Sequence, residues 1–102
     1  MKKRRYAKQH EELAKKFGAL SHPARVKLVL DLMEKEYCVG EMQRSLAISQ
    51  PNVSQHLKIL KEAGIIRGRR EKTTICYKIA DNKVRDALLL FLKGEGTNES
   101  DL

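Results

Sequence analysis

The sequence is poor in several residue types, and each shortage excludes a class of protein. Its 102 residues include no tryptophan, three tyrosines, two phenylalanines, two cysteines and two prolines. No apolar run approaches the roughly 20 residues that a membrane-spanning helix needs. The charged N-terminus lacks the apolar segment of a secretion signal. We therefore expect a protein of the cytoplasm that has no membrane partner.

The motifs of enzymes and metalloproteins are also missing. Cys38 and Cys76 are too far apart in the sequence to form a closely spaced metal-binding or redox pair. In the cytoplasm such thiols are normally reduced. No nucleophile–base constellation, glycine-rich phosphate loop or pair of carboxylates stands out, and the chain is short for a substrate pocket. We therefore expect no enzymatic activity, no cofactor and no bound metal.

Acidic residues are in deficit. Lysine and arginine number 21 against 13 aspartates and glutamates, which gives a formal charge of +8. An excess of this size indicates an anionic partner, most often nucleic acid, although a basic but inert surface is the alternative. The cations cluster at 2–5, at 67–72 and in the segment described next, which favours a partner. With 41% hydrophobic residues, the chain is expected to form one globular domain with a modest core.

The segment 39–64, VGEMQRSLAISQPNVSQHLKILKEAG, carries the strongest structural signal. It is predicted to form two short helices joined by a tight turn. Ser49 is placed as the N-cap of the second helix, Pro51 falls in the first turn, where its missing N–H costs nothing, and Gly64 follows the last turn.

The second helix of this segment has an apolar face and a polar face. Val53, Leu57 and Leu60 recur at i, i+4 and i+7, so this stripe is expected to face a core. The opposite surface is polar and carries Gln50, Asn52, Ser54, Gln55, Lys58 and Glu62. Amides pair with the edges of DNA bases, especially glutamine or asparagine with adenine. The pattern predicts a helix that lies in a groove of DNA.

Three further helices are predicted outside this segment. Residues 6–20 show helical spacing of apolar residues, and a second helix starts at Pro23, a residue preset for the first helical position, and runs to about residue 36. A last helix is predicted over 82–93. Its stretch 87–92 is apolar all round, and one core-facing side cannot bury all of it, so a second protomer is the simplest partner.

A short β-prone segment and a two-stranded hairpin complete the elements. Residues 37–39 form the short segment. Apolar residues alternate at positions 75, 77 and 79, which predicts a strand with one buried face, and residues 67–69 are its expected antiparallel partner. The turn between them, residues 70–73, is a charged tip without an Asn-Gly pair, so its type stays open.

The order of these elements is that of a winged helix-turn-helix with an extra helix at each end. Over about residues 17–92, the sequence resembles the ArsR/SmtB family of bacterial repressors. The segments that carry the resemblance are ALSHPARVKLVLDL, YCVGEM, LAISQPNVSQHLKILKEAGII and ICYKI.

The resemblance implies a mainly α fold with a small β hairpin, in which the additional N- and C-terminal helices pack together in a homodimer. It implies binding to a partly palindromic operator in double-stranded DNA and release when an inducer binds. The residues expected at the dimer interface are Tyr6, Leu13, Leu88, Leu89, Phe91 and Leu92. We divide the chain into a basic arm (1–5), the winged-helix and dimerisation domain (6–93) and a flexible acidic tail (94–102).

The resemblance also places the DNA contacts. The positions expected to touch base edges are Gln50, Ser54 and Gln55. The positions expected to touch phosphates or groove walls are Ser49, Asn52 and Lys58. Four cations of the wing fit minor-groove or phosphate contact: Arg67, Arg69, Arg70 and Lys72. The structural alternatives are a cap for Ser49 and a solvated face for the wing, and His56 is interpreted as a packing or hydrogen-bonding residue.

The metal site that precedes the recognition helix in this family is incomplete. The family box around ELCVCDL is EYCVGEM here, so Cys38 remains and Gly40 stands where a second cysteine would be. Glu41 and, across the dimer, His10 would add only weak ligands, whereas tight thiophilic sensing uses several thiolates. Tight metal sensing is therefore not expected, and Cys38 is the candidate for a thiol switch.

Two other sensing arrangements of the family are incomplete as well. A metal site on the last helix retains Asp81, but Lys83 replaces its first histidine. Redox-sensing members pair a cysteine near Cys38 with one in the last helix, and residues 82–93 contain none. Cys76 could neighbour Cys38 but is out of phase with positions 75, 77 and 79. Two unrelated small side chains are therefore favoured over a disulfide.

Two alternatives to an inducible repressor stay open. One is a winged-helix module that serves only protein–protein contact, which would not need cations on both the recognition helix and the wing. The other is a DNA-binding regulator without a small-molecule switch.

Overall fold

The computed structural model describes residues 5–93, so most of the predicted basic arm and the whole predicted acidic tail lie outside the described residues. The elements, in order, are α1 (Lys8–Ala19), α2 (Pro23–Glu34), β1 (Tyr37–Cys38), α3 (Val39–Leu46), α4 (Gln50–Glu62), β2 (Ile66–Glu71), β3 (Thr74–Ile79) and α5 (Asn82–Leu92). This order confirms the predicted winged helix-turn-helix with an added helix at each end.

The ends of the helices follow from the local sequence. The hydroxyl oxygen of Ser49 accepts a hydrogen bond from the N–H of Asn52 (3.4 Å) and caps α4, whose first turn contains a proline. Gly64 follows that helix with a φ of +76°, in the left-handed region that favours glycine. α1 and α2 are shorter than predicted, because the backbone is extended at Ala7 before α1 and at Lys35 after α2.

The core lies where α2, α4 and the base of the wing meet. The predicted apolar stripe of α4 is confirmed, because Val53, Leu57 and Leu60 are at most 2% exposed. They belong to one cluster with buried residues of α2 and the start of β2, namely Leu28, Val29, Leu32, Ile65 and Ile66. Full burial of one such side chain contributes roughly 1.5–3 kcal/mol. α4 is therefore held with its polar face outward.

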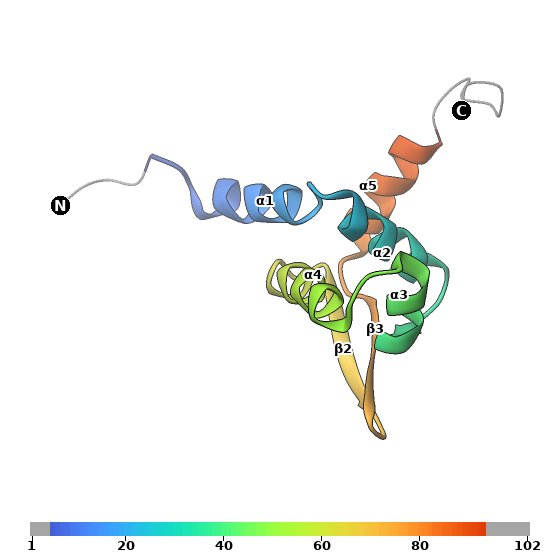
Figure 1. Ribbon diagram of the computed structural model, residues 1–102. Coiled ribbons are helices and arrows are strands. Elements are labelled where there is room, and N and C mark those ends of the chain that lie inside the picture. The colour runs from blue at the N-terminus through green and yellow to red at the C-terminus, as the bar shows by residue number, and fades with distance from the viewer. Residues whose placement is uncertain (1–4, 94–102) are drawn as a thin grey trace.

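The three strands form an antiparallel sheet in the order β1–β3–β2. β2 and β3 form the wing, which Figure 1 shows as a hairpin that points away from the helices. The predicted turn at 70–73 was too long, because Arg70 pairs with Ile75 and Glu71 pairs with Thr74. The turn lies at residues 72–73, and Lys72 adopts a φ of +56° there. The left-handed position of the turn is thus occupied by a residue other than glycine or asparagine. The position and type of the turn could therefore not be predicted from its residue types.

The pairing of β1 with β3 brings the two cysteines together. Cys38 lies opposite Cys76 in the register, and the two form a disulfide. This corrects the expectation of two unrelated thiols. The expectation of one buried face on β3 was also wrong, since Cys76 is 4% exposed while Ile75 is 37% exposed. α2, α3 and β1 all contact β3, so apolar alternation alone does not mark its buried side.

α1 and α5 leave much of their apolar surface uncovered. Figure 1 shows them as two arms that extend from the core, α1 in blue and α5 in orange-red. α1 buries only Ala19, and α5 buries only Val84. The large exposed apolar side chains on or next to these two helices are Tyr6, Leu13, Phe17, Leu89, Leu90, Phe91 and Leu92. Within residues 5–93, no helix combines the length and apolarity needed to cross a membrane.

Candidate nucleic-acid interface

The polar face of α4 lies on the surface. The side chains expected to contact DNA from this helix and its cap are all exposed: Ser49, Gln50, Asn52, Ser54, Gln55 and Lys58. The capping alternative for Ser49 holds, since its oxygen accepts the Asn52 N–H. A hydroxyl that accepts such a bond keeps a hydrogen that can be donated. α4 therefore presents amides and hydroxyls outward, which are the groups that pair with base edges.

A polar network attaches α3, the first helix of the motif, to α2. Lys27 Nζ donates to Asp31 Oδ2 (3.1 Å) and to Ser45 Oγ (2.8 Å). Ser45 Oγ donates in turn to the same oxygen of Asp31 (3.3 Å). The chain then enters α4 through Ala47, which has a φ of +56°. Both helices of the motif are thus anchored on α2, α4 by apolar packing and α3 by this network.

His56 connects α4 to the start of α2. Its Nδ1 lies 3.3 Å from Arg25 Nη1, and its ring centroid lies 4.6 Å from that of His22. Arg25 Nε also donates to the carbonyl oxygen of Ala19 (2.7 Å), so the guanidinium links the end of α1 and the start of α2 to the middle of α4. Burial, together with the charges of His22 and Arg25, lowers the pKa of His56. The predicted hydrogen-bonding or packing role of His56 is confirmed.

The four cations of the wing are exposed, but they are not equivalent. Arg69 forms ion pairs with Glu36 (2.7 Å) and Glu71, and its hydrogen bond lowers the pKa of Glu36. Within residues 5–93, the other three form no ion pair: Arg67, Arg70 and Lys72. The charge of Arg69 is therefore compensated inside the protein, while the other three charges face outward without a counterion from the described chain.

A second charge feature lies at the base of the wing. Arg67 is directly opposite Lys78 across the β2–β3 ladder, and both are exposed. Like charges in directly opposed positions destabilise an antiparallel pair. The hydrogen bond from Arg69 is the largest cause of the lowered pKa of Glu36, but this carboxylate also lies close enough for the charge of Lys78 to lower its pKa. It therefore offsets part of this repulsion, and a phosphate placed over both side chains would offset more of it.

The residues of the incomplete metal site are engaged in other contacts. Cys38 is disulfide-bonded, and its N–H donates to Glu41 Oε1 (3.0 Å) at the start of α3. This bond lowers the pKa of Glu41, which also pairs with Lys35 (3.6 Å). The Nδ1 of His10 accepts the N–H of Ala7. No group of three histidine, cysteine or acidic side chains placed to hold a metal occurs in residues 5–93.

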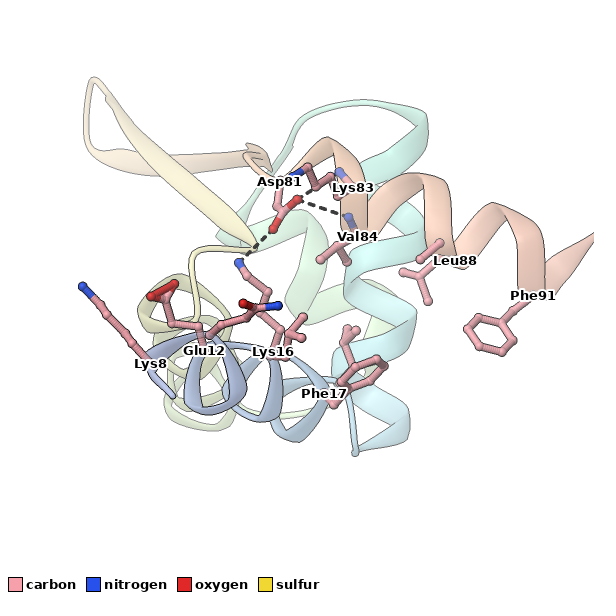
Figure 2. A pocket seen from close by; sticks show the side chains of 13 residues that line it. Lys8, Glu12, Lys16, Phe17, Asp81, Lys83, Val84, Leu88 and Phe91 are labelled. Carbon is pink, nitrogen blue, oxygen red and sulfur yellow. Dashed lines mark hydrogen bonds and ion pairs between the residues drawn. The ribbon is translucent and has the colours of Figure 1, made fainter. Parts of the chain in front are cut away.

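Asp81, which the resemblance places at a metal site of the family, is the N-cap residue of α5. Its Oδ1 accepts the N–H groups of Lys83 (2.9 Å) and Val84 (3.2 Å). The cation beside it comes from α1, because Lys16 Nζ lies 2.8 Å from Asp81 Oδ2. Figure 2 shows these groups at one end of a cavity of about 570 Å³ between α1 and α5.

Phe17 is an apolar residue that the expected interface omitted. It lines the same cavity as Leu13 and Phe91 and is 66% exposed. Leu13 and Phe17 are four residues apart and therefore lie on one face of α1. This four-residue spacing could have placed Phe17 with Leu13 in the interface predicted from the sequence.

Comparisons with known proteins agree with this architecture. A protein-family model described as "Bacterial regulatory protein, arsR family" matches residues 22–67. The chain is 44% identical over 71 residues to the HTH-type transcriptional repressor SmtB of Mycobacterium tuberculosis, a match that covers 70% of this chain and 53% of that protein. It is 41% identical over 76 residues to the biofilm growth-associated repressor of Xylella fastidiosa, with 74% and 67% covered.

A solved structure supports the same grouping. The fold is similar to the solution structure of the homodimeric winged helix-turn-helix DNA-binding domain of Mb0332 from Mycobacterium bovis, described as a possible ArsR-family transcriptional regulator. The TM-score is 0.80 at 25% sequence identity, and the match covers 96% of this chain and 93% of that one. The part of this chain that matches SmtB covers 53% of the length of that protein, or about half.

We expect Arg70→Ala to reduce the salt dependence of DNA binding and Arg69→Ala to leave it unchanged. Each phosphate contact contributes a slope of roughly 0.9 in log K against log salt, and the side chain of Arg69 is already held by two carboxylates. Fluorescence anisotropy of a labelled duplex over a range of salt concentrations measures both slopes. Equal losses of slope would mean that Arg69 leaves its carboxylates to bind DNA.

The free energy of unfolding is expected to fall as the pH drops below 6.5, the ordinary pKa of histidine. Because the folded-state pKa of His56 is lowered, the unfolded state binds the proton first. This contribution to stability is complete above 6.5 and is lost as the pH falls through the lowered value. Denaturant titrations between about pH 7.5 and about pH 5 should show a smaller loss in His56→Gln. His10→Gln is the matched control, and an unchanged loss in His56→Gln would contradict the assignment.

Proposed function

This chain belongs to the ArsR family of bacterial regulatory proteins, and from that membership we propose that it is a homodimeric, sequence-specific transcriptional repressor. Its partner is a partly palindromic operator in double-stranded DNA in the cytoplasm. An inducer releases the protein from this operator.

One observation carries the proposal: the outward polar face of α4 adjoins a wing on which three exposed cations, Arg67, Arg70 and Lys72, have no ion-pair partner within residues 5–93. α4 contacts β2, so the two surfaces are neighbours in the molecule. On DNA, Gln50, Ser54 and Gln55 would meet base edges in the major groove. The wing would meet phosphates or the minor groove through Arg67, Arg70 and Lys72.

The exposed apolar surfaces of α1 and α5 support the homodimer. Leu90 and Phe91 are 72% and 78% exposed, and Phe17 is 66% exposed. Contiguous apolar patches on a protomer mark interaction sites. In an isologous dimer, each such side chain is buried twice, once on each subunit. The pairing would also place two copies of α4 on one side of the molecule, as a two-fold operator requires.

We assign the sensing step to Cys38. This residue is the N-cap of α3 and is bonded to Cys76 of the wing strand β3. Making or breaking that bond would change the attachment of the wing to the first helix of the motif. The metal alternative is weaker, because Glu41 already serves the Cys38 N–H and Lys35.

The proposal is tested with DNA that the protein selects from a random-sequence pool. We expect one sequence to be enriched, and we expect Gln50→Ala and Gln55→Ala to lose roughly 1–3 kcal/mol of discrimination for a bidentate contact to a base. The readout is the ratio of affinities for the selected and a scrambled duplex. Gln9→Ala, an exposed amide on α1, is the control. If no sequence is enriched from the pool, the proposal is wrong.

The dimer is tested by the double variant Leu89→Glu, Phe91→Glu. Burial of each apolar side chain contributes roughly 1.5–3 kcal/mol, and every contact occurs in both subunits. Sedimentation is expected to show monomers at concentrations at which the wild type is dimeric. Ile75→Glu places the same acid at an exposed apolar position of the wing and should leave the dimer intact. A dimer of wild-type strength in the double variant would place the interface elsewhere.

A further inference from the structure

Lys16 of α1 holds two helices at once. Its ammonium donates to the carbonyl oxygen of Ala63 (2.9 Å) and lies 2.8 Å from Asp81 Oδ2. Figure 2 shows the lysine side chain reaching from α1 to Asp81 at the start of α5. The Lys16 and Asp81 side chains are only 28% and 17% exposed, so solvent screens this pair less than a pair on the open surface.

Both oxygen atoms that contact the ammonium carry negative charge, partial in one case and full in the other. Ala63 is the C-cap residue of α4, where the free carbonyl groups of the helix carry partial negative charge. Asp81 is the N-cap of α5 and uses its other oxygen for the first N–H groups of that helix. The hydrogen bond from Lys16 is the largest cause of the lowered pKa of Asp81. One cation therefore neutralises the end of the recognition helix and the cap of the last helix.

These two contacts lie at the two roots of the wing. Residues 64–80 leave the end of α4, form the hairpin and return to α5. The carbonyl oxygen of Ile65 accepts the N–H groups of Ala80 (2.8 Å) and Asp81 (3.3 Å), which closes the base of this loop. Lys16 binds the residue before the loop and the residue after it. It is thus a polar link between α1 and the unit formed by α4 and the wing, in addition to the link that Arg25 makes between Ala19 and His56.

The geometry points to Lys16 as a positioning residue for operator recognition, an inference that rests on the proposed function. The ammonium sets the orientation of α4 and the wing relative to α1 and α5, the helices that would form the dimer. In a two-fold dimer that orientation determines how far apart the two recognition helices stand. Half-sites must match this distance, because successive major grooves lie about 34–36 Å apart.

The test uses the operator selected by the wild type and a set of duplexes in which the spacing between half-sites is changed by single base pairs. We expect the wild type to prefer one spacing. Lys16→Met keeps the aliphatic stem and removes the ammonium. It should lose about tenfold affinity at the preferred spacing and much less at the others, a size typical of coupling between sites. The preference for spacing then becomes flatter.

Two variants control for charge and for folding. Lys15→Met removes one cation from the exposed side of the same helix, so it should lower affinity equally at every spacing and keep the preference. Lys16→Arg should restore the preference at least in part, because a guanidinium can serve both acceptors. Sedimentation and thermal unfolding are to be measured for each variant, to check that it is a folded dimer. If Lys16→Met does not fold, Asp81→Asn, which keeps the capping oxygen, takes its place.

The possible outcomes separate the inference from the proposed function. A wild-type spacing preference in folded, dimeric Lys16→Met would overturn the positioning role. So would an equal loss of affinity at all spacings, since that result describes stability or charge alone. If the wild type enriches no sequence, the proposed function fails first and the inference fails with it. A flattened preference that Lys16→Arg restores would establish the positioning role.

Discussion

The burial of one stripe of α4 is the constraint on which the rest of the structure depends. An α-helix turns once in 3.6 residues, so placing Val53, Leu57 and Leu60 inward leaves no choice about which side chains face outward. Leu28 and Val29 of α2 form the opposing surface of the core and are fully buried. Truncation of a buried leucine typically costs about 2–5 kcal/mol, a large part of a stability of about 5–15 kcal/mol. The same apolar residues of α4 therefore both stabilise the core and determine which polar side chains face outward.

Local sequence predicted the helices well and the sheet less well, for physical reasons. A cap such as Ser49 or a left-handed glycine such as Gly64 acts on residues close to it in the sequence, so the helix end that it forms can be predicted from the local sequence. The pairing of Cys38 with Cys76 depends on the register between strands distant in sequence. The turn was misplaced because Lys72 adopts a conformation that its residue type does not favour.

The same distinction applies to the candidate site. The exposed polar face of α4 followed from periodicity, so its members could be named from the sequence. The difference between Arg69 and the other wing cations depends on Glu36, which arrives from the α2–β1 connection. Asp31, Glu36 and Asp81 each hold a cation at a junction between elements. These three acidic groups thus stabilise contacts between elements, whereas Arg67, Arg70 and Lys72 of the wing have no acidic partner within residues 5–93.

The disulfide between Cys38 and Cys76 has a topological consequence. With a sequence separation of 38, it closes a covalent ring that contains α3, α4 and β2, while α1, α2 and α5 lie outside it. In the chain-entropy account, closing a ring of this size contributes roughly 4 kcal/mol by restricting the unfolded chain. A single break of the backbone inside the ring would leave one covalent molecule, whereas a break next to α1 or α5 would separate that helix from the rest of the chain. While the disulfide is intact, α3, α4 and β2 therefore stay covalently attached to the rest of the chain after any single backbone break inside the ring.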